Sequence, residues 1–152
     1  MKLACAARFR CCLNSRADMT ALLACPCGRT DAKNRAVAYV DCCGRFVEHF
    51  ATTPAPDAEH LMRSRYSAFV LARADYLLAT WHSSTRPTSL EFDVGAKWLG
   101  LDVREHKVTG TATAEVEFVA RYRLAGAAVR LHERSRFVRE DVRWFYVDGD
   151  QR

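Results

Sequence analysis

The chain has 152 residues, of which 49% are hydrophobic and 27% are charged, a composition typical of a globular protein with one domain and a small appendage. No apolar run approaches the ~18 residues of a membrane-spanning helix, and the first twenty residues lack the continuous apolar centre of a secretory signal. The sequence therefore predicts no membrane insertion and a cytoplasmic location, where cysteine thiols stay reduced.

The positive charge gathers in the first third of the chain. Residues 1–50 carry 8 Lys and Arg against 4 Asp and Glu, whereas residues 51–152 carry 15 against 14. A nucleic-acid surface would need a broader basic stripe with interleaved aromatic residues. We therefore expect a basic shell around a negatively charged metal centre, and nucleic-acid binding is not expected.

Residues 1–18 differ from the rest of the sequence. They show no hydrophobic period, and they contain Cys5, Cys11 and Cys12 without a partner motif. One interpretation places the true start at Met19, which leaves 134 residues and four paired cysteines. The alternative is a disordered, arginine-rich N-terminal tail. In both cases the first folded unit is expected to begin near residue 19.

Residues 19–50 contain four cysteines in two tight pairs, Cys25-x-Cys27 and Cys42-Cys43, separated by fourteen residues. In a reducing compartment such pairs favour a metal ion over a disulfide. Four thiolates suit tetrahedral Zn²⁺, with Zn–S bonds of about 2.3 Å and no open position for water, so the predicted site is structural. A reactive pair at Cys42 and Cys43 is the alternative, although redox pairs are usually spaced Cys-x-x-Cys.

Two helices are predicted next. Asp57 is a good N-cap for a helix over residues 57–70, and Asp75 can cap a shorter helix over residues 76–81. In the first helix, Arg63 is expected to point outward and Arg65 to lie near the edge of the apolar face. That face consists of Ala58, Leu61, Met62, Tyr66, Phe69 and Val70.

After residue 96 the hydrophobic period changes to two, which predicts strands over residues 97–108, 113–124, 128–140 and 142–150. The first strand is expected to place Leu99, Leu101 and Val103 on one face. Short turns between the strands predict an antiparallel meander. Helices followed by such a curved sheet indicate an α+β domain over residues 51–152, with the helices in the concavity of the sheet.

One predicted strand breaks its own pattern, because Glu133 and Ser135 fall on its apolar side. A carboxylate on an inward face must be paired, hydrogen-bonded or protonated. One hypothesis is an ion pair with Arg63 or Arg65. The other is a general acid or base at the bottom of a pocket, whose further lining residues would be Ser135, Arg65, Tyr66, Trp144 and Tyr146.

The pattern CPCG…CCGRF resembles the SEC-C motif, a small zinc knuckle found at protein termini, notably on the bacterial preprotein translocation ATPase. The resemblance covers residues 25–28 and 42–44. It implies that the four cysteines bind zinc and that the knuckle contacts a protein partner. The sequence departs from the motif in a longer spacer and at residues 28–31, where GRTD replaces the usual GSGK.

Residues 54 to 149 resemble the YchJ family of uncharacterised bacterial proteins. The resemblance rests on the segments APDAEHLMRSRYSAFVLARADYLLATWH, WLGLDV, VEFVARY, ERSRF and WFYVDG. It implies an N-terminal SEC-C motif joined to a domain of the nuclear transport factor two-like fold, a cone of curved sheet around helices. The family has no assigned reaction, so the resemblance implies a fold but no reaction.

Two functional hypotheses follow. In the first, the chain is a zinc-binding accessory protein whose knuckle contacts a protein partner, while the cone domain is the scaffold and could form a homodimer. In the second, the interior of the cone binds a small molecule or acts as an enzyme, with Glu133 as acid or base. The cone fold serves catalytic and non-catalytic proteins alike, so the sequence does not decide whether this protein is an enzyme.

Overall fold

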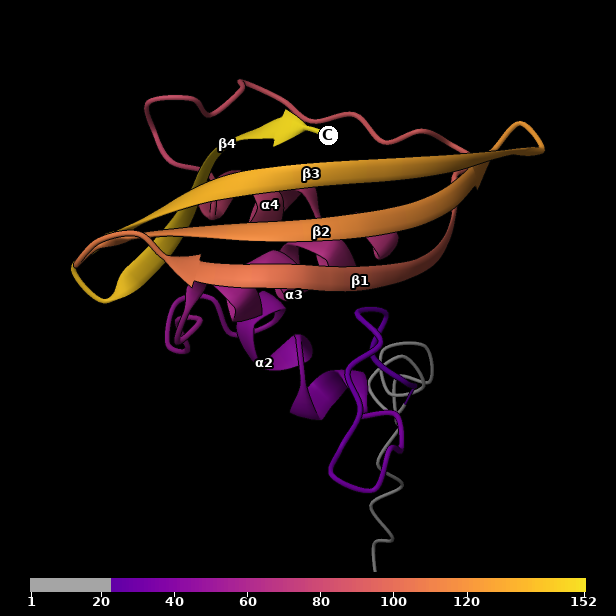
Figure 1. The fold of residues 1–152 in the computed structure, drawn as a ribbon, viewed down its shortest axis with the longest axis horizontal. Coiled ribbons are helices and arrows are strands. Elements are labelled where there is room, and N and C mark those ends of the chain that lie inside the picture. Colours follow the sequence, from indigo (N-terminus) through magenta and orange to yellow (C-terminus); the bar gives the residue numbers. More distant parts are fainter. Residues whose placement is uncertain (1–22) are drawn as a thin grey trace, which may run out of the picture.

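The computed structural model describes residues 23–152, so residues 1–18 and the alternative start at Met19 lie outside the described residues. The elements follow the order helices, then sheet, which confirms the predicted α+β class (Figure 1). No helix in residues 23–152 is long and apolar enough to cross a membrane. The elements are the 3-10 helix η1 (Tyr39–Asp41), the helices α2 (Gly44–Val47), α3 (Ala58–Val70) and α4 (Ala74–Ala79), and the strands β1 (Lys97–Val108), β2 (Thr113–Leu124), β3 (Ala127–Glu140) and β4 (Arg143–Gln151).

Helix α3 begins where the sequence predicts. The Asp57 carboxylate accepts a hydrogen bond from the backbone N–H of His60 at 2.8 Å, which satisfies one of the free amides of the first turn. Helix α4 begins at Ala74, two residues earlier than predicted. Asp75 therefore lies inside its first turn, and no side chain caps this helix.

The four strands form one antiparallel sheet in the order β1-β2-β3-β4, which confirms the predicted meander. An irregularity between Trp98 and Gly100 interrupts the pairing of β1 with β2. Such an irregularity changes which side chains face the core, and here Trp98 packs against the core whereas Leu99 is 51% exposed. The prediction that Leu99 shares an inner face with Leu101 and Val103 is therefore wrong.

The sheet curves over α3, which contacts β1, β2 and β4, and α4 packs against α3 (Figure 1). On β2 the alternation holds as predicted, and Val116, Phe118 and Ala120 are buried. The segment between α4 and β1 passes the β4 side of the sheet, where the Thr85 hydroxyl donates to the Val147 carbonyl oxygen at 2.6 Å. Helix α3, the sheet and parts of this segment line an interior cavity.

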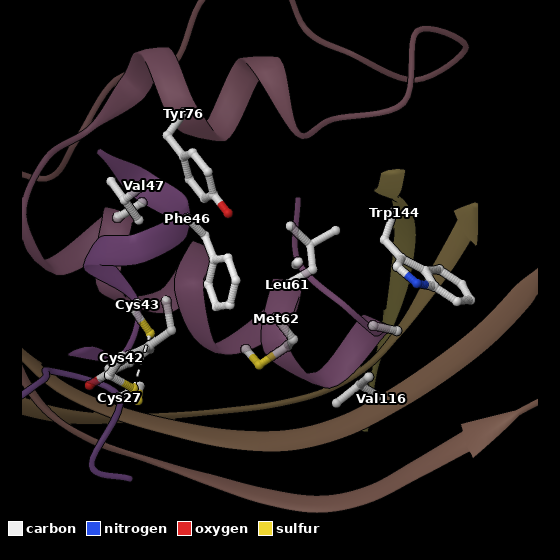
Figure 2. Packing of buried hydrophobic residues seen from close by; sticks show 14 of the residues in the cluster. Cys27, Cys42, Cys43, Phe46, Val47, Leu61, Met62, Tyr76, Val116 and Trp144 are labelled. Atoms are coloured by element: carbon white, nitrogen blue, oxygen red, sulfur yellow. Dashed lines mark hydrogen bonds between the residues drawn. The ribbon is translucent and has the colours of Figure 1, made fainter. Parts of the chain in front are cut away.

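Residues 23–50, here called the cysteine segment, share a buried core with the rest of the described chain. One cluster of buried side chains runs from Cys43 through Phe46 of α2 and Leu61 of α3 to Trp144 of β4 (Figure 2). The cysteine segment is therefore packed onto the α+β body. A domain boundary at residue 50 stays a prediction.

Candidate functional site

The structure gathers Cys25, Cys27, Cys42 and Cys43 in one place, as the sequence predicts. Figure 2 shows three of them, Cys27, Cys42 and Cys43. Their sulfur atoms all lie within 4.8 Å of one another, with 3.6 Å between Cys27 and Cys42 and 4.0 Å between Cys42 and Cys43. Two sulfurs bound to one tetrahedral ion at about 2.3 Å lie about 3.8 Å apart. All four side chains are buried and none is in a disulfide, so the cluster can hold a metal ion.

Two glycines shape the backbone around these sulfurs. Gly28 has a φ of 72°, and its N–H donates to the carbonyl oxygen of Cys25 at 3.0 Å, which closes the turn that carries the first pair. A Cβ atom on Gly44 would lie 2.7 Å from the carbonyl oxygen of Tyr39. Only glycine therefore allows α2 to begin directly after Cys43 at this close approach.

Polar contacts fasten the cysteine segment to α3. Cys25 Sγ lies 3.6 Å from Ser67 Oγ, and the Arg63 guanidinium donates to the carbonyl oxygen of Cys27 at 3.3 Å. Arg63 also donates to the Glu59 carboxylate at 2.8 Å, and its side chain is only 19% exposed. The prediction that Arg63 points outward is wrong, because the cysteine segment covers that side of the helix.

Charge on the sulfur cluster needs compensation. Hydrogen bonds with the thiols of Cys25, Cys27 and Cys42, together with burial, raise the pKa of the Cys43 thiol above its ordinary value. Four thiolates at this spacing repel one another unless a cation lies among them. The donor set and spacing of the cluster are therefore compatible with a metal ion, which would stabilise the thiolate forms.

A second candidate site is a cavity of about 530 Å³ between the sheet and α3. This volume lies within the range of small-molecule pockets, roughly 300 to 1,000 Å³. Five of the six residues that the sequence assigns to a pocket line it, and these are Arg65, Tyr66, Glu133, Ser135 and Tyr146.

Glu133 and Ser135 enter this cavity from β3. The Ser135 hydroxyl donates to Glu133 Oε1 at 2.7 Å, and the Tyr146 hydroxyl donates to the same oxygen at 3.4 Å. Glu133 makes no ion pair within 4.0 Å with any cation among residues 23–152, so the expected pair with Arg63 or Arg65 is not formed. Because both hydroxyls meet Oε1, the second carboxylate oxygen stays available to a ligand.

Arg65 is buried rather than at the edge of the apolar face, with 5% of its surface exposed. Its guanidinium lies 4.5 Å from the ring centre of Tyr146 and 5.1 Å from that of Trp81. It donates to the Leu77 carbonyl oxygen and to Thr80 Oγ1, both at 2.8 Å. Burial lowers the pKa of Arg65 to about 10, so this side chain stays charged at neutral pH.

The structure does not bring Trp144 together with Glu133. Trp144 lies further toward the start of β4, where it borders a separate cavity of about 10 Å³ beside Phe50 and Tyr76. Period-two alternation places it correctly on the same face of the strand as Tyr146. It cannot show that residues from the segment 50–55 lie beside Trp144 at that end of the sheet.

Gly149 makes room for the Glu133 carboxylate. A Cβ atom at this position would lie 2.7 Å from Cδ of Glu133, so Gly149→Ala should displace that side chain and break its hydrogen bond with Ser135. The expected loss in the free energy of unfolding is about 1 kcal/mol, measured by urea denaturation. In a Glu133→Ala background the same substitution should cost almost nothing, and an equal loss in both backgrounds would contradict this explanation.

Comparisons with known proteins agree with this architecture. The family model described as "YchJ, middle NTF2-like domain" matches residues 57–149. A UPF0225 protein of Polaromonas sp. (strain JS666) is 64% identical over 129 residues, which cover 84% of this chain and 93% of the relative. A UPF0225 protein of Bordetella parapertussis is 56% identical over 130 residues, with coverage of 85% and 93%.

Two solved structures share the fold. A SEC-C motif containing protein from Psychrobacter arcticus superposes with a TM-score of 0.73 at 29% identity, covering 86% of this chain and 83% of that one. RPA3114, a SEC-C motif containing protein from Rhodopseudomonas palustris, gives a TM-score of 0.70 at 32% identity, covering 84% and 98%. With its four buried cysteines and its curved sheet, the chain belongs to the YchJ family of UPF0225 proteins.

Proposed function

We propose that this protein binds a small organic molecule in the cavity between its sheet and α3, and that a structural zinc ion holds the cysteine segment on the same helix. The observation that supports binding is the cavity of about 530 Å³, which combines aromatic walls with the polar groups of Glu133, Ser135 and Arg65. A mostly apolar cavity with a few convergent polar groups is the usual form of a ligand site.

The donor set supports zinc as the ion. Cys25, Cys27, Cys42 and Cys43 offer four soft sulfur ligands at the spacing of a tetrahedral site, and zinc with four thiolates is closed to water and substrate. When bound, the ion supplies charge compensation and cross-links two parts of the segment. Four thiolates leave the ion no open ligand position, so its proposed role is structural.

The cysteine segment and the cavity share one helix. Ser67 and Arg63 of α3 contact the cysteine segment, whereas Tyr66 and Phe69 of the same helix line the cavity. A zinc ion that orders the segment would therefore also support one wall of the ligand site. A role of Glu133 as an acid or base on a bound molecule, part of the second hypothesis from the sequence, stays a prediction.

The test uses the full zinc-loaded chain and the indole N–H signals of its three tryptophans in nuclear magnetic resonance. Trp81 and Trp98 line the cavity, and Trp144 does not. In a screen of neutral, cationic and anionic fragments, a ligand of the cavity should shift the first two signals and leave the third in place. A library without such a compound would contradict the proposal.

A matched pair of variants strengthens this test. Ala120→Leu adds bulk to a residue that lines the cavity and is only 1% exposed, so it should abolish the shifts. Ala128→Leu makes the same change at an exposed position of β3 and should leave them unchanged. Shifts that persist in the Ala120→Leu protein would place the ligand outside the cavity.

Binding of a protein partner through the zinc knuckle, the first hypothesis from the sequence, stays a prediction. The contacts of Cys25 and Cys27 with α3 restrict the surface that such a partner could reach to the opposite side of the cysteine segment. A homodimer likewise stays a prediction, which sedimentation analysis of the zinc-loaded chain would test.

A further inference from the structure

One wall of the cavity is a cluster of aromatic rings centred on Trp98. Its ring centre lies 5.4 Å from that of Tyr66, 6.2 Å from that of Phe69 and 4.9 Å from that of Tyr122. Phe92 of the α4–β1 segment extends the cluster through an edge-to-face contact with Phe69 at 6.1 Å. All five rings line the cavity. Such a group of ring faces attracts a cation that enters it, because each face carries partial negative charge.

The charged residues of the cavity are mostly acidic. Glu91, Asp93 and Glu133 line it, and Arg65 is the one basic lining residue in the described part of the chain. Arg65 is 5% exposed and packs on Trp81, whereas Glu91 and Asp93 are exposed on the segment before β1. A cleft with an excess of one sign of charge and apolar walls concentrates ions of the opposite sign.

These three carboxylates also lack ionic partners in the described chain. None of them has a basic side chain from residues 23–152 within 4.0 Å, whereas carboxylates on the outer face of the sheet are paired. Glu105 and Glu115, for example, both pair with Arg134, at 2.8 and 3.2 Å. The chain thus pairs carboxylates elsewhere on the sheet at close range, whereas in the cavity Arg65 interacts with Glu133 only at longer range and Glu91 and Asp93 have no paired basic side chain in the described residues.

We propose that the ligand of this cavity is an organic cation, a substituted ammonium group carried on an apolar or aromatic body. The ammonium group lies against the ring cluster around Trp98, close to the carboxylates of Glu91 and Asp93, and the apolar body fills the space toward Phe118. This inference rests on the proposed function, because it names the class of molecule that the same cavity binds.

Three probes of similar shape test whether the cavity prefers a positively charged ligand. Benzyltrimethylammonium is the cation, neopentylbenzene replaces its nitrogen with carbon, and phenylmethanesulfonate carries an anionic tetrahedral group. Affinities are measured from the indole signals of Trp81 and Trp98, with Trp144 as the internal reference. The cation should bind roughly tenfold more tightly than the neutral probe, and the anion should bind most weakly.

A pair of double variants tests the role of the carboxylates. Glu91→Gln with Asp93→Asn should weaken binding of the cation about fivefold and leave the neutral probe unaffected. Glu140→Gln with Asp141→Asn makes the same changes outside the cavity and should alter neither affinity.

Two results separate this inference from the proposed function. If the neutral probe binds in the cavity as tightly as the cation, the inference is overturned and small-molecule binding stands. If the cation produces no shift of Trp81 or Trp98, the inference is also overturned, and the wider fragment screen decides the proposed function.

Discussion

Replacing Cys43 with serine is expected to lower the affinity for zinc by at least on the order of 100-fold and to unfold the cysteine segment. Structural zinc sites in small peptides bind with an apparent free energy of roughly 10 to 16 kcal/mol. One thiolate of four accounts for on the order of 3 kcal/mol of that energy, which corresponds to about a hundredfold in affinity. Cys43 is 1% exposed, so water cannot easily replace its sulfur as a ligand.

Loss of zinc should unfold the cysteine segment and leave the sheet folded. The sheet is held by antiparallel pairing of each strand with its neighbour from β1 to β4, so its amides should remain protected when the metal is lost. Amides of residues 23–50 should exchange with solvent at rates near those of an unfolded chain. Metal content after dialysis against a chelator, and hydrogen exchange of the apo and loaded chains, measure the two effects.

Cys12→Ser is the control for the loss of a thiol, because Cys12 belongs to neither pair of the motif. That variant should keep one equivalent of zinc. A Cys43→Ser protein that retains one equivalent against the same chelator would refute the four-thiolate site. Retained amide protection in residues 23–50 without metal would instead show that packing on α3 suffices to fold the segment.

The sequence predicts best those parts of the structure that depend on residues close together in the chain. The meeting of the two thiol pairs can be predicted because the ligand types and their spacing lie within one short stretch of sequence. The strands can be predicted from a hydrophobic period of two. The same period places Glu133 on the inward face, since a polar residue within a regular apolar pattern can be identified without tertiary information.

The remaining features depend on contacts between distant segments. The irregularity after Trp98 changes which side chains face inward, and its one local sign is Gly100, since a glycine within a strand often marks a bulge. Likewise, the segment that carries Glu91 and Asp93 has no periodic pattern, so its place at the cavity could not be predicted. The helical pattern gives the wrong environment for Arg63, because it cannot show that another part of the chain covers the polar side of the helix.

Arg65→Ala is expected to reduce the free energy of unfolding by about 3 kcal/mol, the larger of the two losses expected within α3. The Arg65 side chain joins three elements, because it donates to the Leu77 carbonyl oxygen of α4 and to Thr80, and it lies on the ring of Tyr146 in β4. Its removal leaves the Leu77 carbonyl oxygen without this donor and opens a void between α3 and the sheet.

Two further variants separate the effect of the Arg65 hydrogen bonds from that of its side-chain volume and of its position in α3. Arg65→Met keeps most of the volume but removes the donors, so it should lose less stability than Arg65→Ala. Arg63→Ala makes the same truncation two residues away, where the side chain pairs with Glu59 at a partly exposed site, and should cost about 1 kcal/mol. Urea denaturation of the zinc-loaded chains measures all three. If Arg65→Ala were no more destabilising than Arg63→Ala, the buried guanidinium would not be the link that holds α3, α4 and β4 together around the cavity.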